Sequence, residues 1–127
     1  MDFKEKKAIY LQIAEMLCDE ILLGKYKEEE RIPSVREYAT TVEVNANTVV
    51  RTYEWLQMQE IIFTKRGLGY FVAHGARETI ATMRRKEFLN ESLPEVFRTM
   101  RTLGISMEEV TERFNKYEVG QEKEDSL

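Results

Sequence analysis

The chain has 127 residues, of which 43% are apolar and 33% are charged, a composition that fits one soluble globular domain, or a small domain with an appendage, and excludes a disordered chain. It holds no apolar run long enough to cross a bilayer and opens without a secretory apolar core, so we expect a cytoplasmic protein with no membrane contact. The formal net charge of −4 counts against nucleic-acid binding unless the cations gather on one face, because phosphate contacts need positive charge.

The first predicted element is an amphipathic helix over residues 8–23. Apolar residues recur there in two adjacent stripes, which make a wide face suited to a core. The stripes are Ile9, Ile13, Leu17 and Ile21, and Tyr10, Ala14, Cys18 and Leu22. Gly24 is placed to end this helix in the left-handed conformation, and the polar residues 25–31 should form a solvated connection.

A short second helix is predicted from Val35 to about Thr41. Pro33 keeps the residue before it extended, and Ser34 and Glu37 stand at the spacing of a capping box, in which each side chain bonds the other residue's backbone N–H. The first turn presents free amides together with Arg36, a favourable place for a DNA phosphate. We therefore place Ser34 and Arg36 at a DNA interface, with an ordinary surface ion pair as the alternative for Arg36.

The third predicted helix has one apolar face and one exposed polar face suited to contact with DNA. Asn45 can cap its first turn, and an apolar face is expected from Val49, Leu56 and either Tyr53 or Thr52. The groups left on the surface are those that hydrogen-bond base edges and phosphates, namely Asn47, Thr48 and Arg51, with Glu54 beside them. Residues 41–44 form the joint, so the two helices make a helix-turn-helix.

A β-hairpin is predicted next, with strands at residues 61–66 and 70–73 and a loop at residues 67–69. Gly67 and Gly69 permit a tight tip, and Lys65 and Arg66 place positive charge beside it. A hairpin after a helix-turn-helix is a wing that reaches DNA; the alternative is a hairpin that only closes the core.

The negative net charge is compatible with DNA binding only if the cations lie together with the acidic residues behind them. The cations concerned are Lys4, Lys6, Lys7, Arg36, Arg51, Lys65 and Arg66. This hypothesis about geometry fails if acidic side chains are mixed among them.

Three short amphipathic helices are predicted after the hairpin. They run from Ala76 to about Asn90, from Ser92 to Gly104 and onward from Ser106, and residues 121–127 should form a flexible tail. So few residues cannot make a core alone, so residues 76–120 should be a dimerisation region and residues 1–75 the DNA-binding domain. The expected dimer contacts are Ile80, Met83, Phe88, Leu93, Val96, Phe97, Met100, Leu103, Val110 and Phe114. The alternative is that these helices pack on their own DNA-binding domain.

Residues 10–73 resemble the amino-terminal winged helix of the GntR family of bacterial transcription regulators. The motifs that carry the resemblance are the first helix ending at Gly24, the run from Arg31 to Ala39, the run from Val44 to Leu56, and the glycine pair of the hairpin. The short remainder of the chain is most similar to the YtrA-like branch. The resemblance implies a mainly α fold with a small β-hairpin, an N-terminal winged helix-turn-helix followed by a short helical dimerisation region.

By this resemblance the DNA-contacting positions are Arg36, Asn45, Asn47, Thr48 and Arg51, with Lys65, Arg66, Gly67 and Gly69 in the wing. Three positions depart from the family pattern. Ala46 replaces a proline, Glu43 replaces the glycine of the turn, where a positive φ would be strained, and Gln59-Glu60 replaces the glycine that ends the third helix.

These observations predict a transcription regulator, a repressor that binds an inverted-repeat DNA operator as a homodimer. Two recognition helices would then lie roughly 34 Å apart, one DNA turn. The alternative is a winged helix used for protein–protein contact. No catalytic constellation or zinc-ligand spacing is present, so we expect no enzyme activity, no metal and no cofactor. The sequence leaves open whether a small-molecule effector exists.

Overall fold

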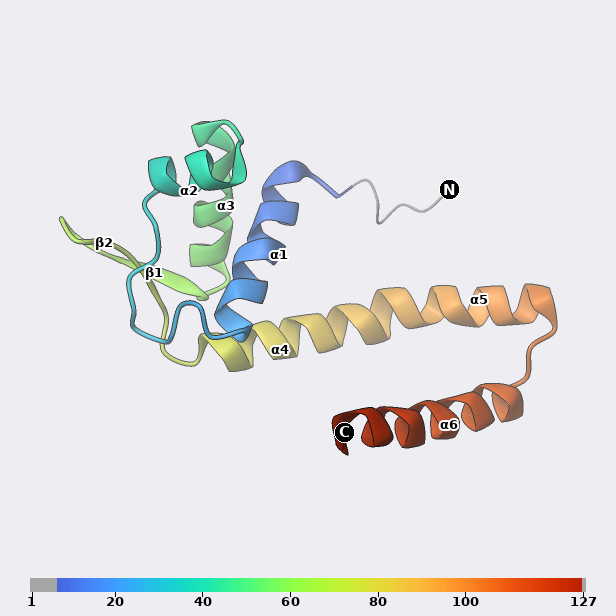
Figure 1. Cartoon of the computed structure of the whole chain (residues 1–127). Coiled ribbons are helices and arrows are strands. Elements are labelled where there is room, and N and C mark those ends of the chain that lie inside the picture. Colours follow the sequence, from blue (N-terminus) through green and yellow to red (C-terminus); the bar gives the residue numbers. More distant parts are fainter. Residues whose placement is uncertain (1–6, 127) are drawn as a thin grey trace. The chain divides into compact units, whose positions relative to one another are not determined.

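The structure, a computed structural model, describes residues 7–126, with side chains to residue 120, and divides the chain into two compact units that meet at Arg84 and Arg85. The first unit holds α1 (Ile9–Leu22), α2 (Val35–Val42), α3 (Ala46–Met58), β1 (Ile62–Lys65), β2 (Gly69–Val72) and most of α4 (Ala76–Glu87) (Figure 1). The second holds the end of α4, a π-helical turn η2 (Phe88–Ser92), α5 (Leu93–Leu103) and α6 (Met107–Ser126). The predicted class, mainly α with one small hairpin, is confirmed. None of the helices within residues 7–126 combines the length and apolar character of a membrane span.

The core of the first unit is built on one face of α1. The buried residues of α1 belong to the two predicted stripes and are Ile13, Ala14, Leu17, Cys18 and Ile21. Ile9, at the start of the helix, is 55% exposed and lies outside the core. Gly24 follows with φ +86°, so it ends α1 in the left-handed conformation that the sequence predicts.

Buried tyrosines connect α2, α3 and the hairpin. The Tyr53 ring lies 6.2 Å from Tyr38 and 4.8 Å from Tyr70, measured between ring centroids. The Tyr53 hydroxyl donates to the backbone carbonyl of Pro33 over 2.7 Å, and the Tyr38 hydroxyl donates to the Glu20 carboxylate over 2.6 Å. Burial raises the pKa of both phenols, so both remain protonated donors at neutral pH.

Part of the predicted solvated connection, residues 25–31, pairs with the hairpin. Arg31 forms an isolated antiparallel bridge with Phe71, and the N–H of Ile32 donates to the carbonyl of Tyr70 over 2.9 Å. The chain entering α2 is therefore held against the outer edge of β2, which fixes the position of the hairpin relative to α2.

The first unit extends beyond the predicted boundary at Gly75. Ala76 and Ile80 of α4 have no exposed surface and belong to the core, and Met83 packs half-buried against it. The expectation that Ile80 contacts a second copy is therefore wrong, because this side chain is already buried within its own unit. Met83 is largely covered for the same reason.

Arg77 of α4 completes the C-terminus of α1. One guanidinium nitrogen donates to the carbonyls of Ile21 and Leu22, over 3.1 and 2.8 Å. The last carbonyls of a helix lack intrahelical partners and carry the negative end of its dipole, so a cation satisfies both needs. This contact fastens the start of α4 to the end of α1.

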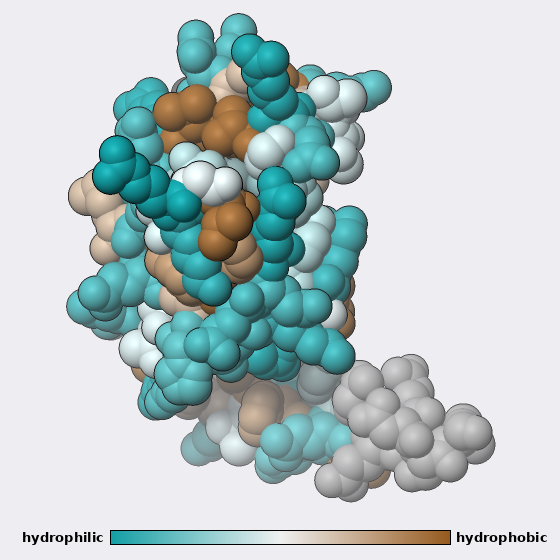
Figure 2. All heavy atoms as spheres, turned by 90° about the vertical axis from the view of Figure 1, so that its left-hand side faces the viewer, coloured by the Kyte–Doolittle hydropathy of each residue, from teal (hydrophilic) through white to brown (hydrophobic). Residues whose placement is uncertain are grey.

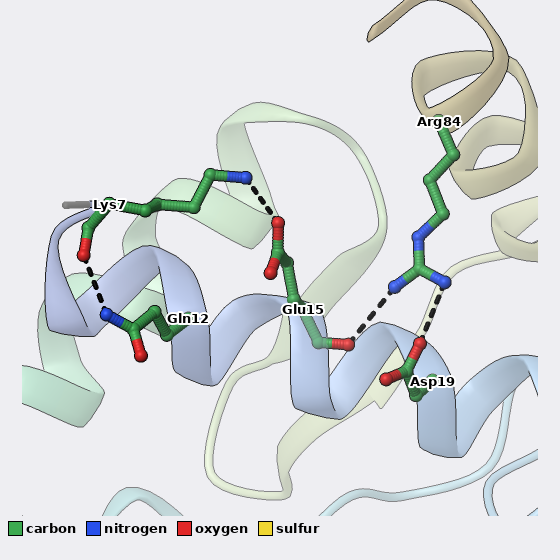
Figure 3. Close-up of polar contacts among 5 residues, drawn as sticks. All are labelled: Lys7, Gln12, Glu15, Asp19 and Arg84. Atoms are coloured by element: carbon green, nitrogen blue, oxygen red, sulfur yellow. Dashed lines mark hydrogen bonds and ion pairs between the residues drawn. The ribbon is translucent and has the colours of Figure 1, made fainter. Parts of the chain in front are cut away.

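Arg84 makes a second attachment between α4 and α1 (Figure 3). Its guanidinium pairs with the Asp19 carboxylate over 2.7 Å and donates to the backbone carbonyl of Glu15 over 3.2 Å. Lys7 pairs with the Glu15 side chain, and the Gln12 amide donates to the carbonyl of Lys7. Residues before α1 and residues of α4 therefore converge on the same exposed side of α1.

In the second unit, α5 starts where the sequence predicts, with Leu93 after Ser92, but the predicted break before it is absent. Ser92 is itself helical, with φ −72° and ψ −46°, and α4 passes through η2 into α5 without an interruption. The physical reason is Pro94, which lacks an N–H and crowds the carbonyl four residues earlier. A π-helical turn widens the helix before the proline and accommodates it without ending the helix.

The loop between α5 and α6 follows the sequence prediction. Gly104 has φ +69° and ends α5, and the Ser106 hydroxyl accepts from the N–H of Glu109 over 3.2 Å at the start of α6. The prediction that the chain frays from Gln121 differs from the structure, in which α6 continues to Ser126; Leu127 lies outside the described residues.

Candidate nucleic-acid interface

The N-terminus of α2 is organised by the predicted capping box. The Ser34 hydroxyl accepts from the N–H of Glu37 over 3.2 Å, and the Glu37 carboxylate accepts from the N–H of Ser34 over 2.9 Å. The pKa of Glu37 is lowered most by the hydrogen bond to the Ser34 backbone, and further by the hydrogen bond to the Ser34 side chain. Arg36 lies exposed in the same turn, where the remaining free amides offer a place for an anion.

The joint between α2 and α3 contains a non-glycine residue in the left-handed conformation. Glu43 has φ +57° and ψ +49°, and its N–H bonds the carbonyl of Ala39. Glu60, after α3, also has a positive φ, of +63°. Both are positions where the resemblance expects glycine, so a side chain adopts the left-handed conformation there at the cost of local strain.

The helix α3 divides into a buried face and a polar face. The Asn45 side chain accepts from the N–H of Asn47 over 2.8 Å and caps the helix as predicted. The buried residues are Val49, Thr52, Tyr53 and Leu56. Trp55, the one tryptophan of the chain, packs half-buried against the core. Of the proposed DNA-contacting side chains, Asn47 and Arg51 are exposed and Thr48 is half-buried.

Thr52 fastens α3 to α1. Its hydroxyl lies 2.7 Å from the backbone carbonyl of Tyr10 and 3.0 Å from that of Thr48, so two acceptors share its proton. The sequence left open whether Thr52 or Tyr53 faces the core; both do. The polar face of α3 is thereby held at a fixed rotation about the helix axis.

Arg51 has a contact that sequence reasoning missed. Its guanidinium carbon lies 4.2 Å from the centre of the Tyr10 ring on α1. A cation this close to an aromatic face is attracted by the ring quadrupole. No local sequence pattern predicts this contact, because Tyr10 and Arg51 are far apart in sequence. In the sequence, Tyr10 is indistinguishable from the other apolar positions of its helix.

The wing is a hairpin with a three-residue loop. Lys65 pairs with Gly69 in the register of β1 and β2, so the loop is residues 66–68, one position earlier than predicted. Gly67 and Gly69 have φ of +78° and +110°, and the N–H of Leu68 closes the turn onto the carbonyl of Lys65. The tight tip therefore depends on both glycines.

The cations of the wing lie on its surface. Lys65 and Arg66 are exposed, and the Lys65 ammonium lies 4.5 Å from the centre of the Phe71 ring and 5.8 Å from that of Phe63. These rings give the Lys65 side chain a support on the hairpin. A positive group is thus presented beside the loop, as the sequence predicts.

Arg31 is a second residue that sequence reasoning did not assign to the interface. A Cβ at Gly69 would lie 3.2 Å from the Arg31 guanidinium, so glycine leaves room for this side chain against the wing. The positive charge of Arg31 also contributes to the lowered pKa of Glu37. Exposed Arg31 therefore lies between the loop end of β2 and the N-terminus of α2.

Figure 2 shows the face that carries the wing and α2, which is mostly hydrophilic with small, separate apolar clusters. The hypothesis that seven cations share one face, with the acidic residues behind them, is not supported. Lys4 and Lys6 lie outside the described residues, and Lys7 is paired with Glu15. Exposed Glu43 and Glu54 belong to the helix-turn-helix itself, so acidic side chains are not confined to the far side.

The remaining reactive groups are structural. Burial, the largest cause, raises the pKa of the Cys18 thiol to about 11, which makes it a poor nucleophile at neutral pH. Within the described residues, no group of three His, Cys, Asp or Glu side chains is placed to hold a metal ion.

A second surface is formed by the apolar residues of α5, α6 and the helical turn before them. Among the proposed dimerisation residues, those exposed are Phe88, Val96, Phe97, Leu103 and Phe114. Leu93 and Val110 are half-buried, and Met100, at 9% exposure, is covered within this unit. Tyr117 and Val119 of α6 are also exposed. Large apolar side chains exposed in this number are typical of a surface that binds a partner.

Comparisons with known proteins agree with this geometry. The family model described as bacterial regulatory proteins, gntR family, matches residues 9–72. The chain is 33% identical to the HTH-type transcriptional regulator YhcF of Bacillus subtilis, over 93% of this chain and 96% of that protein. It is 30% identical to the HTH-type transcriptional repressor YtrA of the same organism, over 88% of this chain and 85% of that protein. A crystal structure of a GntR-family transcriptional regulator from Bacteroides thetaiotaomicron is 54% identical and superimposes with a TM-score of 0.80, over 90% of this chain and 99% of that one.

Proposed function

Because the chain belongs to the gntR family of bacterial regulatory proteins and is a DNA-binding transcription regulator, we propose that it is a repressor that binds an inverted-repeat operator as a homodimer. Its relatives are regulators and not enzymes. The observation that carries the proposal is the polar face of α3, on which Asn47 and Arg51 are exposed while the opposite face is buried in the core. With DNA as its partner, we propose that the protein acts in the bacterial cytoplasm.

Base recognition is assigned to α3. Its N-terminal turn carries Asn47 and Thr48, and Arg51 follows one turn later. An amide can bond both the N6 and N7 groups of adenine, and a guanidinium can bond O6 and N7 of guanine. Capping by Asn45 and the bond from Thr52 to α1 keep this turn rigid, which lowers the entropy lost on docking in the major groove.

Phosphate contacts are assigned to two places beside α3. The first turn of α2 offers Arg36 and free backbone amides, and the wing offers Lys65 and Arg66. Such contacts set the register of the protein on the duplex without reading sequence. These contacts also offset the repulsion between the phosphates and the acidic residues of the same unit. Salt screens charges that lie farther from the phosphates more strongly than charges in direct contact with them.

The dimer is assigned to the second unit. Its exposed apolar residues include Phe97, Leu103 and Phe114, at 47, 66 and 57% exposure. A second copy would cover them, since a two-fold pair is the commonest protein assembly and offers each face an identical partner. Two linked DNA-binding units would then read two half-sites, which is why we propose an inverted repeat.

Repression is the regulatory sense that we propose. The relative YtrA is described as a repressor. A dimer of small winged helices can repress by occupying DNA alone, with no cofactor. Winged-helix protein–protein contact is the second candidate, and the exposed acidic side chains of the helix-turn-helix favour it.

Selection of bound sequences from random duplex DNA with the purified protein tests the proposal. We expect recovery of one inverted repeat whose half-site centres lie about one helical turn apart, and an affinity that falls steeply as salt rises. Recovery of no sequence, together with salt-independent association with a protein partner, would favour the second candidate. Sedimentation at micromolar concentration tests the dimer, and the mass of one chain would exclude it.

A further inference from the structure

The contact between Tyr10 and Arg51 links α1 to the polar face of α3. The Arg51 guanidinium lies 4.2 Å from the centre of the Tyr10 ring. The rest of the Arg51 side chain is exposed. Arginine has a long side chain with many rotamers, so a single aromatic support selects among them before any DNA arrives.

The same tyrosine is held in place by the backbone. The carbonyl of Tyr10 accepts from the Thr52 hydroxyl over 2.7 Å. Thr52 adjoins Arg51 on α3, so Tyr10 meets two consecutive residues of this helix, one through its main chain and one through its ring. This bond therefore holds the backbone that carries the Tyr10 ring next to the turn of α3 that carries Arg51.

We propose that Tyr10 is a positioning residue for DNA recognition: its ring orders the Arg51 guanidinium and so determines how well one base is discriminated. The inference rests on the proposed operator contact of Arg51. Tyr10 itself need not touch DNA. It acts by reducing the rotamers that Arg51 gives up on binding, and by directing a planar donor group that requires defined geometry to bond a base bidentately.

The two links can be separated by mutation. The bond from Thr52 uses the main chain of Tyr10, so it persists when the side chain of Tyr10 is changed. Tyr10→Leu removes the aromatic face and keeps an apolar side chain on α1, whereas Tyr10→Phe keeps the aromatic face and removes only the hydroxyl. The unfolding temperature of each variant checks that the fold is retained.

The test is a double-mutant cycle on the selected operator, with Tyr10→Leu, Arg51→Ala and both together. Tyr10→Leu should weaken operator binding by about 2- to 5-fold, the worth of one exposed cation–π contact, and reduce discrimination at the base position that Arg51→Ala also affects. In the Arg51→Ala background, Tyr10→Leu should cause no further loss. Tyr10→Phe should bind like the original protein.

A matched control is Tyr26→Leu. Tyr26 is a half-buried tyrosine whose ring has the Lys25 ammonium 5.6 Å from its centre, in the connection after α1. Its loss should leave base discrimination unchanged. A similar loss of discrimination in Tyr26→Leu would show that any weakened core has this effect, and would overturn the inference.

The remaining outcomes are decisive in the same way. Equal losses from Tyr10→Leu with and without Arg51, or a Tyr10→Phe variant as weak as Tyr10→Leu, would overturn the role of the ring. If Arg51→Ala binds the operator normally, the assigned contact of Arg51 is wrong and the inference falls with it, while operator binding stands. Failure to select any operator would instead count against the proposed function itself.

Discussion

The hydroxyl of Thr52 donates a hydrogen bond to the main-chain carbonyl of Tyr10 over 2.7 Å and joins α3, the proposed recognition helix, to α1. Thr52 is fully buried among apolar residues, and it is the polar residue that the core of the described chain encloses. A buried polar group is tolerated only when it is hydrogen-bonded. This bond therefore ties the stability of the unit to the placement of the polar face of α3, the surface proposed to read DNA.

Thr52→Val should lower the free energy of unfolding by about 0.5 to 1.5 kcal/mol, because valine has the same shape but removes the hydrogen bond to the Tyr10 carbonyl, which keeps only its donor within α1. Urea unfolding measures the change. Thr40→Val is the matched control, since Thr40 is exposed and bonds only the Arg36 carbonyl of its own helix. Equal destabilisation by both substitutions would show that the link between α3 and α1 contributes nothing.

Glu43→Gly should stabilise the protein by about 1 kcal/mol, because glycine adopts a φ of +57° without the strain that a side chain suffers there. It should also tighten DNA binding by removing an acidic group from the helix-turn-helix. Glu43→Gln separates the two effects: it removes the charge and keeps the strain. We expect Gln to improve DNA affinity without a gain in thermal stability. A stability gain from Gln equal to that from Gly would refute the strain argument.

The capping box at Ser34 and Glu37 predicts a dependence of stability on pH. The pKa of Glu37 is lowered in the folded chain by its hydrogen bonds to Ser34. The stabilisation is therefore present above the ordinary glutamate pKa and is lost as the pH falls through the lowered value. Glu37→Gln retains a capping side chain without a titrating group. Between neutral pH and pH 3, the original protein should lose more stability than this variant, as measured by urea unfolding; parallel losses would contradict the assignment.

Lys65→Ala and Arg66→Ala should each weaken binding to all DNA sequences and make the dependence of log affinity on log salt shallower by about one unit, if each side chain contacts one phosphate. Binding to the selected operator and to random duplexes, at several salt concentrations, measures both effects. Lys27→Ala is the control, because Lys27 is exposed on the connection after α1. A slope that changes no more in the wing variants than in the control would remove the wing from the interface.

Ile80→Ala and Leu103→Ser should have different consequences. Ile80 is a fully buried core residue, so its truncation should cost about 2 to 5 kcal/mol of stability. Leu103 is 66% exposed, so its replacement should weaken the proposed dimer and leave the melting of the first unit unchanged. Sedimentation and thermal unfolding distinguish the two. Dissociation without unfolding in the Ile80 variant would restore its predicted interface role.

The elements of the first unit could be predicted because their signals are local. Ser34 and Glu37 identify the start of α2 at a fixed spacing, Asn45 identifies the start of α3, and the two glycines identify the hairpin. Each signal reflects backbone donors and acceptors that must be satisfied within a few residues.

What sequence reasoning missed depends on contacts between distant segments. The sequence predicts Ile80 to be an interface residue, because it does not show that Arg77 fastens α4 to the end of α1. The sequence predicts Tyr10 to be a core residue, whereas in the structure the Arg51 guanidinium lies over its ring. Pro94 looks like the start of a helix because the π-helical turn that accommodates it has no sequence signature of its own.

The half-buried side chain of Trp55 gives the recognition helix an optical signal of its own. Since the chain has one tryptophan and it lies in α3, its fluorescence arises from the segment proposed to enter the groove. Emission from the unlabelled protein should therefore report both the melting of this helix and its approach to DNA, without a dye attached to the surface being measured.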